Sequence, residues 1–219
     1  MILKIPKMIL HFFLRLNNLN KRHNLSCFDV NYLVIDLELT GLNSKQDEIV
    51  SLAWLPIVKQ RIYVGKGKYF INSQVGKLKQ SPIFHGLDTG AIEQGKPLNS
   101  ALEQLVKLID DSVLVFHNAS LDWAFLLKAF KDYNISIPTE KIKSIVMIDT
   151  MKIEHRRLSR QSQDMRFDAL NLERCRKRYH LPDYANHNAF TDAMATAELL
   201  LAQINNMSRS KALLIKQLL

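Results

Sequence analysis

The chain has 219 residues, of which 47% are hydrophobic and 23% charged, and its formal net charge is +9. This length supports one domain with a substantial core, and the composition excludes a disordered chain. The apolar runs are shorter than a membrane-spanning helix needs, so we expect no stable membrane insertion. The two cysteines, Cys27 and Cys175, have no C-x-x-C partner, which is typical of a cytoplasmic protein rather than a disulfide-rich or zinc-binding one. A basic surface favours a polyanionic substrate, although it also suits an ordinary soluble protein.

The first thirty residues are both basic and apolar, which predicts an amphipathic helix after Pro6. They lack the apolar core and small-residue cleavage site of a signal peptide. We expect this helix to pack against the domain, while a membrane-surface or partner-binding role stays open. The predicted organisation is therefore a basic apolar extension over residues 1–30, a main domain over 31–205 and a tail or helix end over 206–219.

Residues 32–38 predict a buried strand, because they begin with an apolar run rich in β-branched residues. Asp36 and Glu38 follow directly after this run. Side chains alternate between the two faces of a strand, so these two carboxylates point the same way. Adjacent carboxylates repel each other, and both stay ionised only if a cation lies between them. A pair of exposed strand-end carboxylates is the ordinary alternative.

A second strand is predicted over residues 49–58, and residues 61–64 and 69–72 predict a hairpin that continues the sheet. We therefore expect three consecutive antiparallel strands. From residue 59 to residue 79 there are six basic residues and none that is acidic. This segment is either a positively charged lip or an edge kept soluble by lysine.

The next elements are a helix over residues 97–108, a short strand over 112–116 and a second helix that Ser120 would cap. Asp122 then falls in the first turn of that helix. The helix dipole alone favours an acidic residue there, so a role beyond helix stability needs other evidence.

The last third of the chain begins with a predicted strand over residues 145–148. The segment 156–167 is polar and predicts a mobile loop, and 169–179 predicts a helix with a basic face. The alanine-rich second half of residues 184–201 predicts a strong helix. His187 lies in the loop that enters it, and Asp192 lies in its first turns.

Acidic residues and one histidine thus recur where elements end, the positions at which α/β folds place their sites. Converging carboxylates without basic partners favour Mg²⁺ or Mn²⁺ over zinc. Two such ions about 3.5–4 Å apart can hold both the attacking and the leaving oxygen of a phosphoryl displacement. A neutral histidine beside them can accept a proton from water.

This pattern resembles the DEDDh family of 3′-5′ exonucleases, in the branch of the epsilon proofreading subunit of bacterial DNA polymerase III. The first motif is Val34-Ile-Asp-Leu-Glu-Leu-Thr-Gly41 and the second is Val115-Phe-His-Asn-Ala-Ser-Leu-Asp122. The third, His187-Asn-Ala-Phe-Thr-Asp192, has the His-x4-Asp spacing. His85-Gly86 and Ile148-Asp-Thr150 resemble further family positions. The resemblance covers residues 30–203 and implies an α/β, ribonuclease H-like exonuclease fold with a mixed central sheet flanked by helices.

The resemblance also implies a role for each motif residue. Asp36 would bridge two Mg²⁺ or Mn²⁺ ions, Glu38 and Asp192 would complete the first ion's ligands, and Asp122 would hold the second, partly through water. His187 would be the general base that activates water, and the products would be nucleoside 5′-monophosphates.

Other positions would contact substrate or serve the fold. Leu39 and Thr40 would lie against the terminal nucleotide, and His117 and Asn118 are further candidates near the substrate. We interpret Asp149 as structural. Leu39 stands where polymerase-type members often have Thr, which makes the first motif similar to that of oligoribonuclease, whereas the second motif resembles the polymerase type.

The leading hypothesis is therefore a metal-dependent 3′-5′ exonuclease on single-stranded DNA or DNA ends. The alternatives are the same chemistry on RNA or short oligonucleotides, and a noncatalytic nucleic-acid-binding or polymerase-associated module. A DNA polymerase or a repair protein is a candidate partner. The intact set of five motif residues argues against loss of catalysis. The sequence does not specify the oligomeric state.

Overall fold

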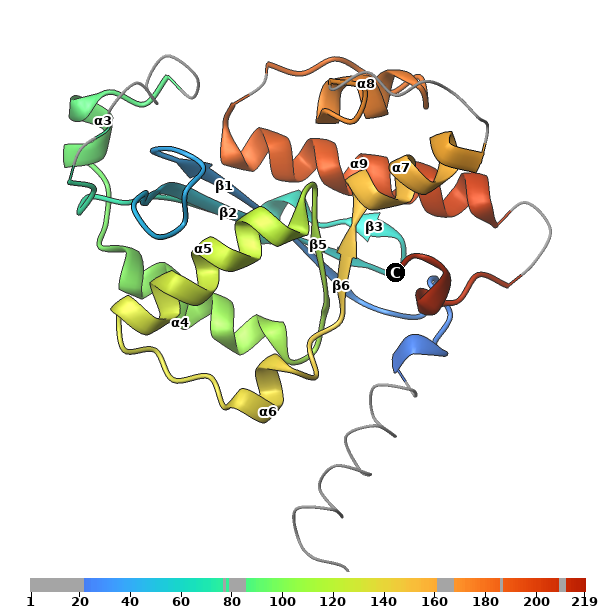
Figure 1. Ribbon diagram of the computed structural model, residues 1–219, viewed down its shortest axis with the longest axis horizontal. Coiled ribbons are helices and arrows are strands. Elements are labelled where there is room, and N and C mark those ends of the chain that lie inside the picture. The colour runs from blue at the N-terminus through green and yellow to red at the C-terminus, as the bar shows by residue number, and fades with distance from the viewer. Residues whose placement is uncertain (1–21, 77, 79–85, 161–167, 186, 209–211) are drawn as a thin grey trace, which may run out of the picture.

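The computed structural model describes residues 22–76, 78, 86–160, 168–185, 187–208 and 212–219. Four strands come first, and helices then precede, separate and follow two further strands, an order that combines a sheet with helices as in an α/β fold. In chain order they are β1 (Tyr32–Leu39), β2 (Ile49–Val58), β3 (Arg61–Ile62), η1 (Val64–Lys66), β4 (Lys68–Ile71), α3 (Thr89–Glu93), α4 (Leu98–Ile109), β5 (Val113–Phe116), α5 (Ala119–Asp132), α6 (Thr139–Ile142), β6 (Met147–Asp149), α7 (Thr150–Arg160), α8 (Leu172–Lys177), α9 (Ala189–Met207) and η2 (Ile215–Gln217). Figure 1 shows these elements along the chain.

The strands form one mixed sheet with the order β3-β2-β1-β5-β6. β1 runs antiparallel to β2 and parallel to β5, and β5 runs parallel to β6. The parallel strands β1, β5 and β6 therefore end at the same edge of the sheet, which is where an open α/β sheet places its site. The expected mixed central sheet flanked by helices is confirmed.

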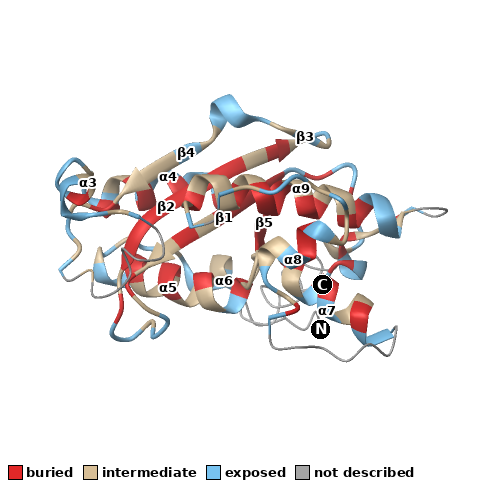
Figure 2. Cartoon of the chain, turned by 90° about the horizontal axis from the view of Figure 1, so that it is seen from above, coloured by how far each residue is buried: buried red, intermediate tan, exposed pale blue. Residues whose placement is uncertain are grey.

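Helices cover both faces of this sheet, and the alternation along β1 decides which side chain meets which helix. Tyr32 and Val34 pack in the core beneath α9, whereas Leu33, Ile35 and Leu37 pack against α4 and α5. In Figure 2 the central strands are largely red, because both faces are covered. Asp36 and Glu38 continue the alternation of Tyr32 and Val34, so both face α9.

β4 pairs differently from the expected hairpin. Its residues pair with Ser51–Trp54 of β2, whereas β3 pairs with Ile57 and Val58 of the same strand. The reason is that β3 has only two residues and is followed by the exposed turn η1. After this turn, β4 pairs with β2 and not with β3. Figure 2 shows this turn in pale blue above the sheet.

Two local predictions were wrong. Residues 156–160, expected in a mobile loop, are the last part of the helix α7, whereas 161–167 lie outside the described residues. Ser120 does not cap α5, because the helix begins at Ala119 and the cap position belongs to Asn118 in the left-handed conformation, with φ of 92°. Asp122 is nevertheless in the first turn, as predicted.

Residues near both ends of the chain pack together. Cys27 donates its backbone N–H to Leu213 (2.9 Å), and Ile215 donates to Leu25 (3.0 Å). Cys27, Leu213 and Ile215 are buried in the core that faces α9. Cys27 and Val30, which fall within the predicted extension, thus contribute to the domain core. The predicted helix after Pro6 lies largely outside the described residues. Within the described part of the chain, no helix has the length and apolar character needed to cross a bilayer.

Candidate active site

The site begins with the two carboxylates at the end of β1. Asp36 pairs with Ala53 of β2 and Glu38 pairs with Ser51, so both residues are held by backbone hydrogen bonds on a central strand. Both are half-buried on the face toward α9. A β-bulge follows Glu38 and ends the regular pairing. The prediction that the two carboxylates share one face is confirmed.

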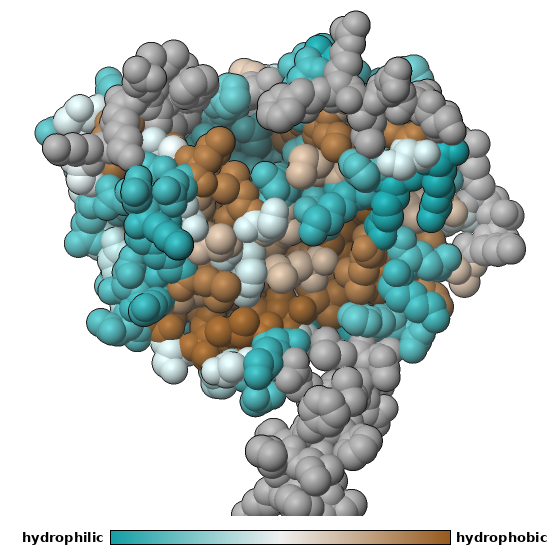
Figure 3. All heavy atoms as spheres, in the orientation of Figure 1, coloured by the Kyte–Doolittle hydropathy of each residue, from teal (hydrophilic) through white to brown (hydrophobic). Residues whose placement is uncertain are grey.

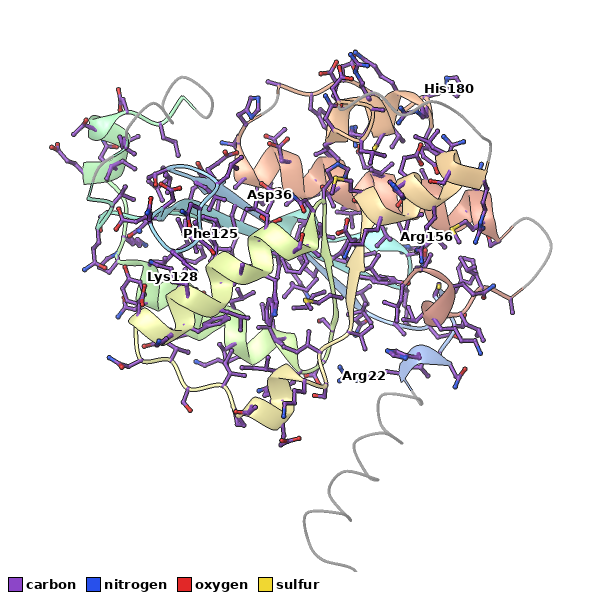
Figure 4. All side chains as sticks on the ribbon, in the orientation of Figure 1. Arg22, Asp36, Phe125, Lys128, Arg156 and His180 are labelled. Atoms are coloured by element: carbon purple, nitrogen blue, oxygen red, sulfur yellow. The ribbon has the colours of Figure 1, made fainter. Side chains whose placement is uncertain are left out.

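Helix α9 brings the third carboxylate to this pair. The Asn188 side chain caps the helix by accepting hydrogen bonds from the backbone of Phe190 (3.1 Å) and Thr191 (3.2 Å). Asp192 lies in the first turn. One oxygen from each of Asp36, Glu38 and Asp192 lies within 4.8 Å of the other two. Figure 4 labels Asp36, which lies where β1, β5 and α9 approach one another.

The fourth carboxylate, Asp122, belongs to α5. It is buried in the first turn of α5, and its charge raises the pKa of Asp36. Among the described residues it does not join the compact group of three oxygens. The structure therefore brings four predicted carboxylates into one neighbourhood, three of them within reach of a single ion.

Burial and mutual repulsion make these carboxylates hard to ionise together. Desolvation and the nearby Asp192 raise the pKa of Glu38 to about 8. Desolvation is also the main cause that raises the pKa of Asp122 to about 8, and it raises the pKa of Asp36 and Asp192. A divalent cation would remove this repulsion, and oxygen donors are those that Mg²⁺ and Mn²⁺ prefer. The residues present therefore fit the expected metal.

His187 lies beside the cluster with an exposed side chain. Its backbone is left-handed, with φ of 67°, and its N–H donates to Asp192 Oδ2 at 2.9 Å. This hydrogen bond ties the histidine to a carboxylate of the cluster while the ring stays open to solvent. An exposed imidazole next to converging carboxylates is suited to proton transfer.

These residues line one cleft with a volume of about 360 Å³. The cleft includes the predicted Asp36, Glu38, His117, His187 and Asp192, and it also includes residues that the sequence did not single out: Leu37, Asn171, Leu172 and Glu173. The last three form the start of α8. Only the basic face of the helix predicted over residues 169–179 pointed to this region, and it gave no reason to choose these residues.

His117 lines the cleft, but both ring nitrogens are already bonded. Nε2 faces the carbonyl oxygen of Leu170 at 2.9 Å, and Nδ1 lies 2.8 Å from the Thr150 hydroxyl. A carbonyl only accepts, so Nε2 carries the proton and donates to Leu170. Burial lowers the pKa of His117, which leaves Nδ1 as an acceptor. The single proton of the Thr150 hydroxyl therefore has two acceptors within reach, Nδ1 and the Phe116 carbonyl at 3.2 Å. His117 thus joins α7 to the segment before α8.

The other expected residues near the substrate are placed differently. Asn118 accepts a hydrogen bond from Ser120 and is not among the residues lining the cleft. The Thr40 hydroxyl is buried and accepts from the backbone of Glu48 (3.0 Å), which holds the loop after β1. Leu39 pairs with Ile49 beyond the bulge. Substrate contacts by Asn118, Leu39 and Thr40 stay predictions, and His85 lies outside the described residues.

Asp149 connects two helices to the sheet. Its carboxylate accepts from the backbone of Asn118 (3.3 Å) and Ala119 (3.1 Å) at the start of α5. It also accepts from Met151 (3.0 Å) and Lys152 (3.1 Å) at the start of α7. Four backbone donors on one buried carboxylate support the structural interpretation of Asp149.

Several known proteins with similar sequences are PolC-type DNA polymerases III that are much longer than this chain. The chain is 23% identical over 176 residues to a PolC-type DNA polymerase III of Caldanaerobacter subterraneus, and 29% identical over 171 residues to that of Listeria innocua. These matches cover 80% and 78% of this chain but only 12% and 11% of the relatives. The chain thus spans about a tenth of the length of these polymerases.

Solved structures share the fold. The cell-death related nuclease CRN-4 has a TM-score of 0.68 at 20% identity, over 83% of this chain and 65% of that one. E. coli exonuclease I in complex with a dT13 oligonucleotide has a TM-score of 0.67 at 14% identity, over 82% and 42%. The nuclease domain of 3′hExo, a DEDDh family member bound to rAMP, has a TM-score of 0.64 at 10% identity, over 83% and 95%.

The family is decided by a direct match over most of the chain. The sequence model of the RNase_T family, described as Exonuclease, matches residues 33–200, which include all five motif residues. The chain belongs to this exonuclease family, as its three motifs predicted.

Proposed function

We propose that this protein is a metal-dependent 3′-5′ exonuclease that hydrolyses the terminal phosphodiesters of single-stranded DNA or DNA ends to nucleoside 5′-monophosphates. The observation that carries the proposal is the group of Asp36, Glu38 and Asp192, whose oxygens lie within 4.8 Å of one another in the cleft described above. Membership of the exonuclease family supports the same reaction class.

The carboxylates would hold two divalent ions. Asp36, Glu38 and Asp192 have the geometry to bind one, and Asp122, whose charge acts on Asp36, would bind the second. When bound, the ions would stabilise the charge that develops on the attacking and leaving oxygens of the phosphodiester. The oxygen ligands favour Mg²⁺ or Mn²⁺.

His187 would accept the proton of the attacking water. Its ring is exposed at the cleft while its backbone is tied to Asp192, so the ring can reach a water molecule beside the carboxylates. A general base must lie within hydrogen-bonding reach of the proton that it removes, directly or through one water. The position of His187 supports this assignment.

Basic residues next to the cleft would attract the polyanionic strand. The exposed basic residues of α7 and α8 are Lys152, Arg160, Arg174 and Lys177. All of these except Arg160 also pair with nearby carboxylates. Figure 3 shows hydrophilic atoms mixed with hydrophobic ones in the region of these helices. Such a field raises the local concentration of nucleic acid and makes binding depend on salt. It offsets the repulsion between the phosphates and the acidic cluster.

The nearest alternative is the same chemistry on RNA or short oligonucleotides. It is favoured by the similarity to 3′hExo, whose structure contains rAMP. The PolC-type relatives favour DNA and suggest a DNA polymerase or repair protein as partner. The relatives are bacterial polymerases, and both cysteines are buried and free, which supports the proposal of a cytoplasmic location.

The test is degradation of 5′-labelled single-stranded DNA and of an RNA with the same sequence, each with Mg²⁺, Mn²⁺ or a chelator. We expect a ladder that shortens from the 3′ end and disappears with chelator, with DNA degraded faster than RNA. Faster degradation of RNA would select the alternative substrate. Absence of degradation with either metal would support the noncatalytic binding module.

A further inference from the structure

Two buried hydroxyls next to the acidic cluster have incomplete hydrogen bonding. Buried polar groups are almost always bonded, so each exception asks for an explanation. In the part of the chain that the structure describes, four buried side-chain atoms lack a hydrogen-bond partner: Ser51 Oγ, Tyr69 Oη, Thr196 Oγ1 and Gln203 Oε1. Ser51 and Tyr69 are neighbours of Glu38, a candidate metal ligand.

The sheet register places Ser51 directly beside Glu38. Ser51 on β2 is the cross-strand partner of Glu38 on β1, so the two side chains share a face of the sheet. Their Cβ atoms are then about 4.5–5.5 Å apart, a distance that a glutamate and a serine side chain can span. Ser51 is fully buried, so its hydroxyl has no contact with bulk solvent.

Tyr69 reaches the same position from the next strand. It pairs with Ala53, which in turn pairs with Asp36, so its side chain lies on the same face as the carboxylates. Burial is the main cause that raises the pKa of Tyr69, and the Glu38 carboxylate raises it further. Ser51 and Asn188 lie close enough to lower this pKa, yet the Tyr69 hydroxyl completes no hydrogen bond of standard geometry.

We propose that Ser51 and Tyr69 are positioning residues that orient the Glu38 carboxylate for a divalent cation. The inference rests on the proposed metal-dependent activity. The compact group of three uses one oxygen of Glu38, which leaves the second oxygen as an acceptor. An ionised carboxylate only accepts hydrogen bonds, and each hydroxyl has one proton to donate.

The hydroxyls of Ser51 and Tyr69 would thus each donate a hydrogen bond to the Glu38 carboxylate once that carboxylate is ionised. Hydrogen bonds to a metal-binding carboxylate fix its rotamer, and loss of such a partner typically weakens metal affinity about 10–100-fold. The arrangement leaves two donors without partners before the ion binds, so it lowers the stability of the metal-free fold. This is the usual exchange between stability and function at a binding site.

The test measures Mn²⁺ binding by calorimetry and, separately, thermal stability in chelator. The variants are Ser51→Ala, Tyr69→Phe and the double variant. Tyr32→Phe is the matched control, because Tyr32 is a buried β1 tyrosine on the same face whose hydroxyl is bonded to the Cys27 carbonyl at 2.6 Å. We expect Ser51→Ala and Tyr69→Phe each to weaken Mn²⁺ binding about tenfold, with metal-free melting temperatures equal to or above that of the wild type.

The control should behave in the opposite way. Tyr32→Phe loses a completed hydrogen bond, so we expect a lower melting temperature and unchanged Mn²⁺ affinity. The double variant should lose less affinity than the sum of the single variants, because both hydroxyls act through one carboxylate. Wild-type affinity in both single variants would overturn this inference alone. A wild-type protein that binds no Mn²⁺ would overturn the proposed metal site as well as this inference.

Discussion

At the scale of single residues, the site is a set of carboxylates whose pKa values are raised by burial and by one another's charge. Glu38 shows this most clearly, because desolvation and Asp192 raise its pKa from 4.5 to about 8. An acid whose pKa is higher in the folded state than in the unfolded state destabilises the fold when it is ionised. The penalty is absent below the unfolded pKa and grows as the pH rises toward the folded one.

We therefore predict that the metal-free protein loses stability between pH 4.5 and pH 8. Glu38→Gln should flatten this decline and raise the melting temperature in chelator at pH 8, with little effect at pH 4.5. Mg²⁺ should stabilise the wild type more at the higher pH, because the ionised carboxylates bind it better. Thermal melts in chelator across this range check the prediction, and a Glu38→Gln variant with the same pH slope as the wild type would contradict it.

His187 permits a sharp test of the base assignment. Its φ of 67° favours asparagine over alanine as the replacement, since Asn tolerates the left-handed conformation. We expect His187→Asn to lower the turnover rate about 10²–10⁴-fold, with Mn²⁺ affinity nearly unchanged. His180→Asn is the control, because His180 is also exposed with a positive φ of 55° and lies in the same α8–α9 connection. Equal rates for the two variants would remove His187 from the base role.

Some residue positions were predictable because one rule fixes them. Alternation along a strand was enough to place Asp36 and Glu38 on one face. The roles of Ser51 and Tyr69 depend on which strands pair and in which register, and a single sequence does not encode this locally. Asn171, Leu172 and Glu173 line the cleft only because α8 folds back over it.

At the scale of elements, long-range contacts explain why two local predictions, the loop over residues 156–160 and the cap of α5, were wrong. Residues 156–160 are charged and polar, which is typical of a loop, yet they belong to α7. This helix is held by the buried Glu154, which accepts from Arg157 Nη2 (2.6 Å) and from the Tyr179 hydroxyl (3.1 Å) beyond α8. The polar residues therefore stabilise the packing of two helices. Similarly, Ser120 does not cap α5, because the first backbone N–H groups already donate to Asp149 of β6.

Asp149 is accordingly expected to matter for stability. Asp149→Ala leaves four backbone donors without their acceptor, and each such group costs about 1–3 kcal/mol when buried, so we expect a loss of several kcal/mol in the free energy of unfolding. Asp132→Ala is the control, because Asp132 belongs to an exposed pair with Lys128 and should change stability by about 0.5 kcal/mol or less. Urea denaturation in the presence of chelator measures both variants. Equal midpoints would show that Asp149 does not connect the helices.

At the scale of the whole molecule, segments near both ends of the sequence complete the core beneath α9. Leu213, Ile215 and Leu218 are buried, and Arg156 of α7 donates to the Leu218 carbonyl at 2.7 Å. Figure 4 labels Arg156 on α7, near the red C-terminal segment. The sequence predicted the sheet and the main helices, but it gave no signal for the pairing of residues 25–27 with residues 213–215, because these two segments are nearly two hundred positions apart.

Ile215→Ala should therefore destabilise the protein by about 2–5 kcal/mol, the usual cost of removing a large buried aliphatic side chain. Leu219→Ala is the control, because Leu219 is 39% exposed and its truncation should cost far less. Chemical denaturation separates the two variants. A stability loss in Ile215→Ala no larger than that in Leu219→Ala would show that the C-terminal segment contributes little to the core.

The central claim is that Asp36, Glu38 and Asp192 bind the ion that supports hydrolysis. The most direct measurement is anomalous diffraction from crystals grown with Mn²⁺, recorded for the wild type and for Asp192→Asn. We expect a strong anomalous peak within coordination distance of the three carboxylates in the wild type, and its loss or weakening in the variant. A wild-type structure whose manganese lies elsewhere, with the three carboxylates free of metal, would contradict the account.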